Sequence, residues 1–256
     1  MSFYSCGVGV PEEVEARRPV IGRLFDIMDR KDHYAWSYLT KPGLSKPQLL
    51  VHFRHEYQTY VRDFPVLLAR VLGLGPPDRV RKALAENIYE EQTGKLSVSR
   101  SHPELFLEMM AGLGFSKNDL EQGPLTNQAQ IYRSFLDQVS MTPPWVHGAA
   151  VLTLFVEGSR HDRAEFAGTR TRPSPESLVE SHPLVVHYGC PTSQMDLVRA
   201  HGEIEGSHRK DAWEMLIENI PDGSRVADEV CEVVEKALRY WLDYRDSVAQ
   251  LMGLSA

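Results

Sequence analysis

The sequence predicts an all-α fold, a single-domain bundle of about seven to nine helices. Apolar residues recur at intervals of three and four along most of the 256 residues, as in amphipathic helices. Alternation of apolar and polar residues, which marks a half-buried strand, is not sustained over five positions. A chain of this length without a linker-like segment fits one domain covering residues 1–256.

In the first half of the chain, capping and stop signals delimit four helical segments. Ser45 and Ser101 stand at N-cap positions, and Gly94 follows the end of a periodic run. Pro65 lies inside the second segment and is expected to kink it. The expected helices cover residues 11–30, 46–72, 76–94 and 101–114.

The second half continues the helical period, with one interruption. Residues 169–191 contain four prolines and lose the periodicity, so they are expected to form a crossover or lid with one short helical turn. The expected helices on either side cover residues 123–139, 142–168, 192–219 and 224–252.

Charge and cysteine content limit the partners and the compartment. The formal net charge is −7 and no block of Lys and Arg occurs, which argues against nucleic acid and anionic membranes. No apolar run reaches the 18 residues that a membrane-spanning helix needs. Cys6, Cys190 and Cys231 are odd in number and far apart, as expected of a protein in the reducing cytoplasm.

One helix carries three polar residues on the face that it should bury. His201, Glu205 and His208 are spaced four and three residues apart, and Leu197 and Met215 continue their stripe. Burying such groups without partners costs several kcal/mol, so a cation, a metal or a hydrogen-bond network is required. The His-x3-Glu-x2-His spacing favours a metal.

Three further residues interrupt apolar stripes, although each also has an ordinary explanation. Glu91 could be a solvated helix-end carboxylate, His102 could cap its helix, and Glu157 could pair with Arg160 or Arg163. Three carboxylates and three imidazoles together suit two first-row divalent ions, whereas zinc would need only three or four of them. The candidate ligands are Glu91, His102, Glu157, His201, Glu205 and His208.

The order of these motifs resembles a known family, the heme-oxygenase-like diiron oxidases. Their relatives in fold are the pyrroloquinoline-quinone synthase and thiaminase II proteins. The resemblance runs from about residue 50 to 210 and rests on the segments HEYQTYVRDFPVLLARVLG, ENIYEEQTGKLSVSRSHPELF, VEGSR and HGEIEGSH. It implies a heme-oxygenase-like bundle and assigns the six candidate residues as ligands. Glu205 departs from the family pattern, in which Asp is common.

The resemblance also implies a chemistry. Two Fe(II) ions per chain would activate O2, the co-substrate, for an oxidase or oxygenase reaction. The expected substrate is a small amino-acid-like metabolite, which undergoes N-oxygenation or oxidative C–C cleavage in specialised metabolism. A homodimer is expected from the fold alone.

Residues near the six ligands receive expected roles. His161, one turn beyond Glu157, is the expected catalytic residue, as a proton donor or as a partner of a ligand. Some family members add a seventh ligand, for which Glu56 and Asp63 are candidates. The expected substrate-binding residues are Tyr57, Tyr60 and Arg160.

Two other functions remain open at this stage. A metal-free enzyme of the same fold would act on a thiamin- or quinone-precursor-like heterocycle, with His201 and His208 as acid and base. A thiaminase-like route would also need a thiol near the pocket, for which Cys190 is the candidate. A non-catalytic helical protein that stores metal or binds a partner is the third possibility.

Overall fold

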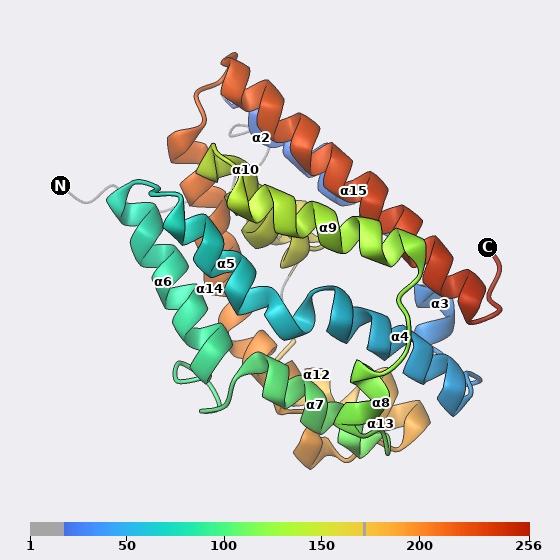
Figure 1. Cartoon of the computed structure of the whole chain (residues 1–256). Helices are drawn as coiled ribbons and strands as arrows, with labels where there is room; N and C mark the ends of the chain where they lie inside the picture. Colours follow the sequence, from blue (N-terminus) through green and yellow to red (C-terminus); the bar gives the residue numbers. More distant parts are fainter. Residues whose placement is uncertain (1–17, 171–172) are drawn as a thin grey trace.

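The computed structural model describes residues 18–170 and 173–256, apart from the side chains of 203–211 and 216–217. Within these residues every regular element is a helix and no strand occurs, which confirms the all-α prediction (Figure 1). The elements are α2 (Pro19–Asp29), α3 (Trp36–Leu39), α4 (Lys46–Thr59), η1 (Val61–Asp63), α5 (Phe64–Gly73), α6 (Asp78–Thr93), α7 (His102–Gly112), α8 (Lys117–Glu121), α9 (Asn127–Met141), α10 (Trp145–Ala149), the π-helix η2 (Ala150–Val156), α11 (Asp162–Phe166), α12 (Pro175–Glu180), α13 (Pro183–Tyr188), η3 (Thr192–Gln194), α14 (Asp196–Asn219) and α15 (Arg225–Leu251).

The longer helices form the bundle, and α15 is its longest member. Helix α9 runs beside α15, and α2 packs behind α15 (Figure 1). Buried residues on α15 recur every three or four positions, as the amphipathic pattern requires. None of the described helices is long and apolar enough to cross a membrane. The helices of ten residues or more are α2, α4, α5, α6, α7, α9, α14 and α15.

Two expected long helices are broken, which corrects the sequence-based boundaries. The segment 46–72 divides at Tyr60, so that Pro65 lies in the first turn of α5 rather than at a kink within one helix. Proline fits there because the first turn has no partner for a backbone N–H. The segment 142–168 divides after the π-helix η2, at Glu157. Both breaks face the same cavity, which is described below.

The other boundaries differ less. The Pro-rich stretch 169–191 contains two short helices, α12 and α13, instead of one turn. The first expected helix is described only from residue 18, and its beginning lies outside the described residues.

The apolar core consists of two clusters. One is formed mainly by α2, α5, α9, η2 and α15, and the other mainly by α4, α7, α8 and the start of α14. Phe64 belongs to the first cluster, Leu197 and Ala200 belong to the second, and all three line one cavity. The cavity therefore lies where the two clusters meet.

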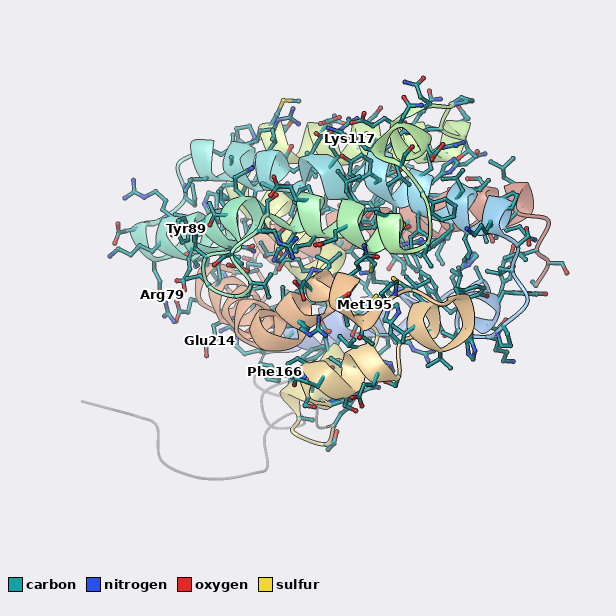
Figure 2. All side chains as sticks on the ribbon, turned by 90° about the horizontal axis from the view of Figure 1, so that it is seen from below. Arg79, Tyr89, Lys117, Phe166, Met195 and Glu214 are labelled. Carbon is teal, nitrogen blue, oxygen red and sulfur yellow. The ribbon has the colours of Figure 1, made fainter. Side chains whose placement is uncertain are left out.

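An ion pair at the surface ties together two of the helices that carry candidate ligands. Arg79 on α6 lies beside Glu214 on α14, with 3.3 Å between the guanidinium and the carboxylate (Figure 2). Both side chains reach the periphery, so the pair contributes at most about 1 kcal/mol.

Candidate functional site

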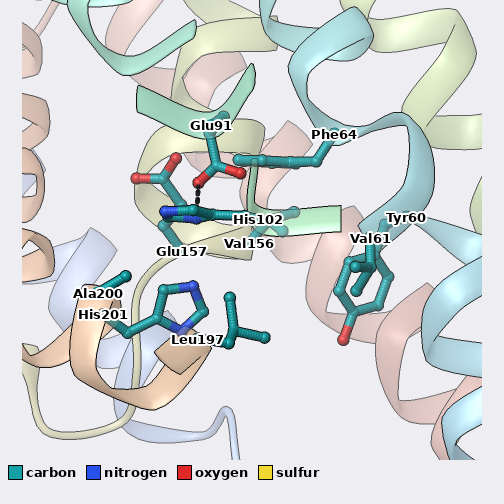
Figure 3. Close-up of a pocket in the computed structure, with 10 residues that line it drawn as sticks. All are labelled: Tyr60, Val61, Phe64, Glu91, His102, Val156, Glu157, Leu197, Ala200 and His201. Carbon is teal, nitrogen blue, oxygen red and sulfur yellow. Dashed lines mark ion pairs between the residues drawn. The ribbon is translucent and has the colours of Figure 1, made fainter. Parts of the chain in front are cut away.

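Four of the six expected ligands line a single cavity of about 170 Å³ (Figure 3). Glu91 comes from the end of α6, His102 from the start of α7, Glu157 from the end of the π-helix, and His201 from α14. The rest of the wall is mostly apolar. It is formed by Tyr60, Val61, Phe64, Val156, Leu197 and Ala200.

A tight connection places His102 opposite Glu91. Gly94 ends α6 with φ +60°, and a Cβ at this position would lie 2.0 Å from the Arg100 carbonyl oxygen, so only glycine fits. The Ser101 hydroxyl then caps α7, as the sequence predicts, and Glu104 completes the capping box. The chain thus reverses within a few residues, and His102 in the first turn of α7 faces the last turn of α6.

Two carboxylates flank the buried ring of His102. Its Nε2 lies 3.3 Å from Glu90 Oε1, and since an ionised carboxylate only accepts, Nε2 is the donor. Its Nδ1 lies 2.9 Å from Glu91 Oε1, and the two form an ion pair when the ring is protonated. Burial lowers the pKa of His102, but Glu91 and Glu90 outweigh that effect, so the pKa is raised.

Two residues of this site were missed by sequence reasoning. Glu90, which the sequence does not single out, is fully buried and accepts a hydrogen bond from the Leu96 N–H at 2.7 Å. Asn87 donates from its amide nitrogen to Glu157 Oε1 at 2.8 Å. Asn87, Glu90 and Glu91 are three and four residues apart on α6, and this spacing is the signal that could have identified them.

Helix α14 supplies the opposite wall of the cavity. The His201 ring meets that of His102 edge to face, with centroids 5.1 Å apart (Figure 3). The side chains of Glu205 and His208 lie outside the described residues, although both belong to α14. Among the side chains that are described, no three His, Cys, Asp or Glu form a group that could hold a metal ion.

The expected catalytic and substrate-binding residues do not all line the cavity that holds the four candidate ligands. Because the helix ends before it, His161 lies in the turn after Glu157 and lines a neighbouring cavity together with Arg160. Tyr60 lines both cavities. Tyr57 instead stacks on Phe106 within the core and is not among the lining residues of either one.

Both candidates for a seventh ligand are engaged by arginines. Glu56 is buried and forms an ion pair with Arg245. Asp63 pairs with Arg62 at 2.8 Å and with Arg133 at 2.6 Å. Neither carboxylate lines the cavity that holds the four ligands.

Lys31 fixes the backbone on both sides of Glu157. Its Nζ donates to the carbonyl oxygens of Phe155 at 2.6 Å, Val156 at 3.2 Å and Gly158 at 2.6 Å. A helix end leaves such carbonyls without partners in the helix, so one ammonium group satisfies several of them at once. Lys31 thereby holds the end of the π-helix, where Glu157 enters the cavity.

Replacing Lys31 by methionine is expected to lower the free energy of unfolding by about 2 kcal/mol, because buried carbonyls lose a charged donor. Urea denaturation measures this change. The matched control is Lys82→Met, since Lys82 is exposed and makes only an i,i+4 pair with Asp78. Equal stability of the two variants would contradict the role given to Lys31.

Helix α11, which follows the turn after Glu157, begins with a buried acid. Asp162 accepts a hydrogen bond from the Ser159 N–H at 2.9 Å, and burial raises its pKa to about 6. The folded protein therefore keeps this proton to a higher pH than the unfolded chain does. The free energy of unfolding should fall by about 2 kcal/mol as the pH rises from about 4 to about 6, out of a total of about 3 kcal/mol over the whole titration.

The variant Asp162→Asn tests this pH dependence, because it retains an acceptor for Ser159 but cannot titrate. Urea denaturation between pH 4 and 7 should show a shallower decline of stability for this variant than for the wild type. The control Asp228→Asn changes an exposed carboxylate and should keep the wild-type slope. An unchanged slope in Asp162→Asn would show that the carboxyl group titrates normally.

Comparison with protein families gives this site a context. Residues 51–242 match a family described as iron-containing redox enzymes. The chain belongs to this family. The match spans all four described candidate ligands, and it confirms the resemblance that the sequence motifs indicate. No curated protein matches the chain significantly.

Two solved structures are similar to this chain in fold. A TenA homologue from Pseudomonas syringae pv. tomato is similar over 96% of this chain and 100% of its own, with 16% identity and a TM-score of 0.68. A domain of unknown function with a heme oxygenase-like fold, from Shewanella denitrificans, is similar over 96% and 95%, with 16% identity and a TM-score of 0.65. These likenesses show that the bundle has the heme-oxygenase-like fold.

Proposed function

We propose that this protein is an O2-activating non-heme diiron oxidase or oxygenase. The observation that carries the proposal is the arrangement of Glu91, His102, Glu157 and His201, which come from four separate segments and line one cavity. Membership of a family of iron-containing redox enzymes supports iron as the metal. We assign Glu205 and His208 to the same ligand set on the basis of their spacing from His201.

The donors fit iron. Carboxylate and imidazole ligands together suit first-row metals. His102 Nε2 donates to Glu90, and Nδ1 lies 2.9 Å from Glu91 Oε1 at the cavity, so Nδ1 and Glu91 together form a pair of donors that a metal ion could bind in place of the proton between them. A metal-binding histidine commonly has this arrangement, in which an outer carboxylate fixes the tautomer. When bound, two ferrous ions would supply the electrons that reduce O2.

The chain itself prepares the site in three ways. Glu90 fixes the tautomer of His102, and Asn87 holds one oxygen of Glu157. Lys31 holds the backbone from which Glu157 extends. The apolar wall, including Phe64 and Leu197, limits the access of water to the polar groups.

We propose a small amino-acid-like metabolite as the substrate, with N-oxygenation or oxidative C–C cleavage as the reaction. The small volume of the cavity supports this choice, since it admits only the reacting part of such a molecule. Tyr60 lines both this cavity and the neighbouring one.

A metal-free activity on a thiamin-like heterocycle is the second candidate, because a TenA homologue shares the fold. This route needs a reactive thiol at the cavity. Cys190 is buried among apolar residues, and its thiol contacts the Met109 carbonyl oxygen at 3.6 Å. Burial raises the pKa of Cys190, which disfavours the thiolate. Neither Cys190 nor Cys231 lines the site cavity.

Anaerobic loading with Fe(II), followed by exposure to O2 in the presence of single amino acids, tests the proposal. We expect about two irons per chain and a burst of O2 consumption that depends on one of the amino acids. Chelator treatment should abolish the consumption. Activity on a thiamin-like compound that persists in chelator would favour the metal-free alternative, and stable iron that never consumes O2 would favour storage.

A further inference from the structure

A second cavity of about 390 Å³ adjoins the candidate metal site, and we call it the outer chamber. Tyr60 and Val156 line both the outer chamber and the inner cavity. The turn after Glu157 forms one wall, and the connection between α2 and α3 forms another. The charged lining residues are Lys31, Asp32, Arg160 and Arg245.

Basic residues outnumber acidic ones in the lining of the outer chamber. Three of its charged lining residues are basic and one is acidic, and that one, Asp32, pairs with Arg160. The inner cavity has the opposite character, since its charged lining residues are Glu91 and Glu157. A ligand that spans both spaces therefore meets positive charge at one end and carboxylates at the other.

Arg245 is the most deeply buried of these cations. Its guanidinium lies over the rings of Trp36 at 4.8 Å and Trp241 at 5.1 Å, and both tryptophans line the outer chamber. Its terminal nitrogens bond to Glu56 and to the Tyr60 hydroxyl, but its buried Nε makes no hydrogen bond in the structure. Glu56 neutralises the charge of Arg245, but a buried Nε–H without an acceptor is costly, and a carboxylate oxygen of a ligand would satisfy it.

We propose that the outer chamber binds the carboxylate of the substrate, with Arg160 and Arg245 as its cationic partners and Trp36 and Trp241 as the surface for its apolar body. This inference rests on the proposed function and adds a binding site and an orientation to it. Arginine suits this role because its planar guanidinium binds carboxylates and stacks on aromatic rings.

The position of the outer chamber determines which end of the substrate reacts. The Tyr60 ring separates it from the inner cavity and lies well away from Glu91, His102 and His201 (Figure 3). None of Glu91, His102 and His201 lines the outer chamber, so a carboxylate bound there lies apart from these three residues. The atom that is oxidised therefore lies at the end of the substrate remote from its carboxylate.

Binding to the iron-free protein tests the inference without any catalytic activity. The probes are 3-phenylpropionate and its uncharged amide, measured by titration calorimetry and by quenching of tryptophan fluorescence. We expect saturable binding of one carboxylate per chain, and binding of the amide that is weaker by about tenfold, as the loss of a charged hydrogen bond implies.

The variants Arg160→Gln and Arg245→Lys should each weaken carboxylate binding and reduce the preference over the amide. Arg160 is partly exposed, so its variant tests the site without disturbing the core. The control Arg23→Gln removes an exposed arginine that pairs with Asp228, outside this chamber, and should bind as the wild type does.

Three outcomes would overturn the inference. They are the absence of saturable binding, equal affinity for acid and amide, and wild-type affinity in both arginine variants. Iron loading is measured separately on the same preparations, so a failure of the outer chamber is distinguishable from a failure of the proposed diiron function. A carboxylate that binds only to the iron-loaded protein would also contradict the inference, because it would place that group at the metal.

Discussion

Replacing His201 by alanine is expected to reduce the iron bound per chain from about two to one or none. The ring faces His102 across a cavity that Glu91 and Glu157 also line, so its loss removes a donor from the side formed by α14. Glu157→Ala should have the same effect, since Glu157 is held at this cavity by Asn87. Anaerobic Fe(II) titration, read by metal analysis after desalting, measures the change.

The matched control for this prediction is His187→Ala. His187 is exposed on α13, where it belongs to the Pro-rich stretch rather than to the cavity. This variant should load iron as the wild type does. Normal loading of two irons by His201→Ala or Glu157→Ala, with helical content unchanged by circular dichroism, would show that the ligand assignment is wrong.

Replacing Arg245 by alanine is expected to lower the free energy of unfolding by about 3–5 kcal/mol, since it leaves a buried charge without its partner. Glu56 accepts hydrogen bonds from Arg245 and from the Tyr244 hydroxyl at 2.8 Å. Burial raises the pKa of Glu56, but Arg245 and its other partners outweigh this effect, so the pKa is lowered. Urea denaturation at pH 7 measures the loss.

Two further variants show whether burial is the cause. Arg23→Ala removes an exposed partner of Asp228 and should cost at most about 1 kcal/mol. The double variant Glu56→Gln, Arg245→Ala removes both charges and should be more stable than Arg245→Ala alone. A loss below about 1 kcal/mol in Arg245→Ala would contradict the view that this pair is a buried, coupled unit.

Local signals in the sequence predicted much of the fold. Ser101 caps α7 and Gly94 ends α6 in the left-handed conformation, as the sequence indicates. These features depend on residues a few positions apart, which a sequence displays directly. The buried stripes that carry Glu91 and Glu157 were visible for the same reason.

The features that were not predicted depend on contacts between distant residues. The carbonyl groups at the end of the π-helix accept hydrogen bonds from Lys31, which lies 124 residues before Phe155. The residues next to the π-helix in sequence therefore do not show where it ends. Glu56 is neutralised by Arg245, which lies 189 residues away. The separation of Tyr57 from Tyr60 follows from the break in the second helix, which places only Tyr60 at the cavity.

The central claim is that Glu91, His102, Glu157 and His201 bind iron in one cavity. A crystal structure of the Fe(II)-loaded protein, with anomalous data collected on both sides of the iron absorption edge, tests it most directly. We predict iron peaks within coordination distance of all four side chains, with Glu205 and His208 completing the set. Iron bound elsewhere, or a cavity without iron after loading under anaerobic conditions, would contradict the claim.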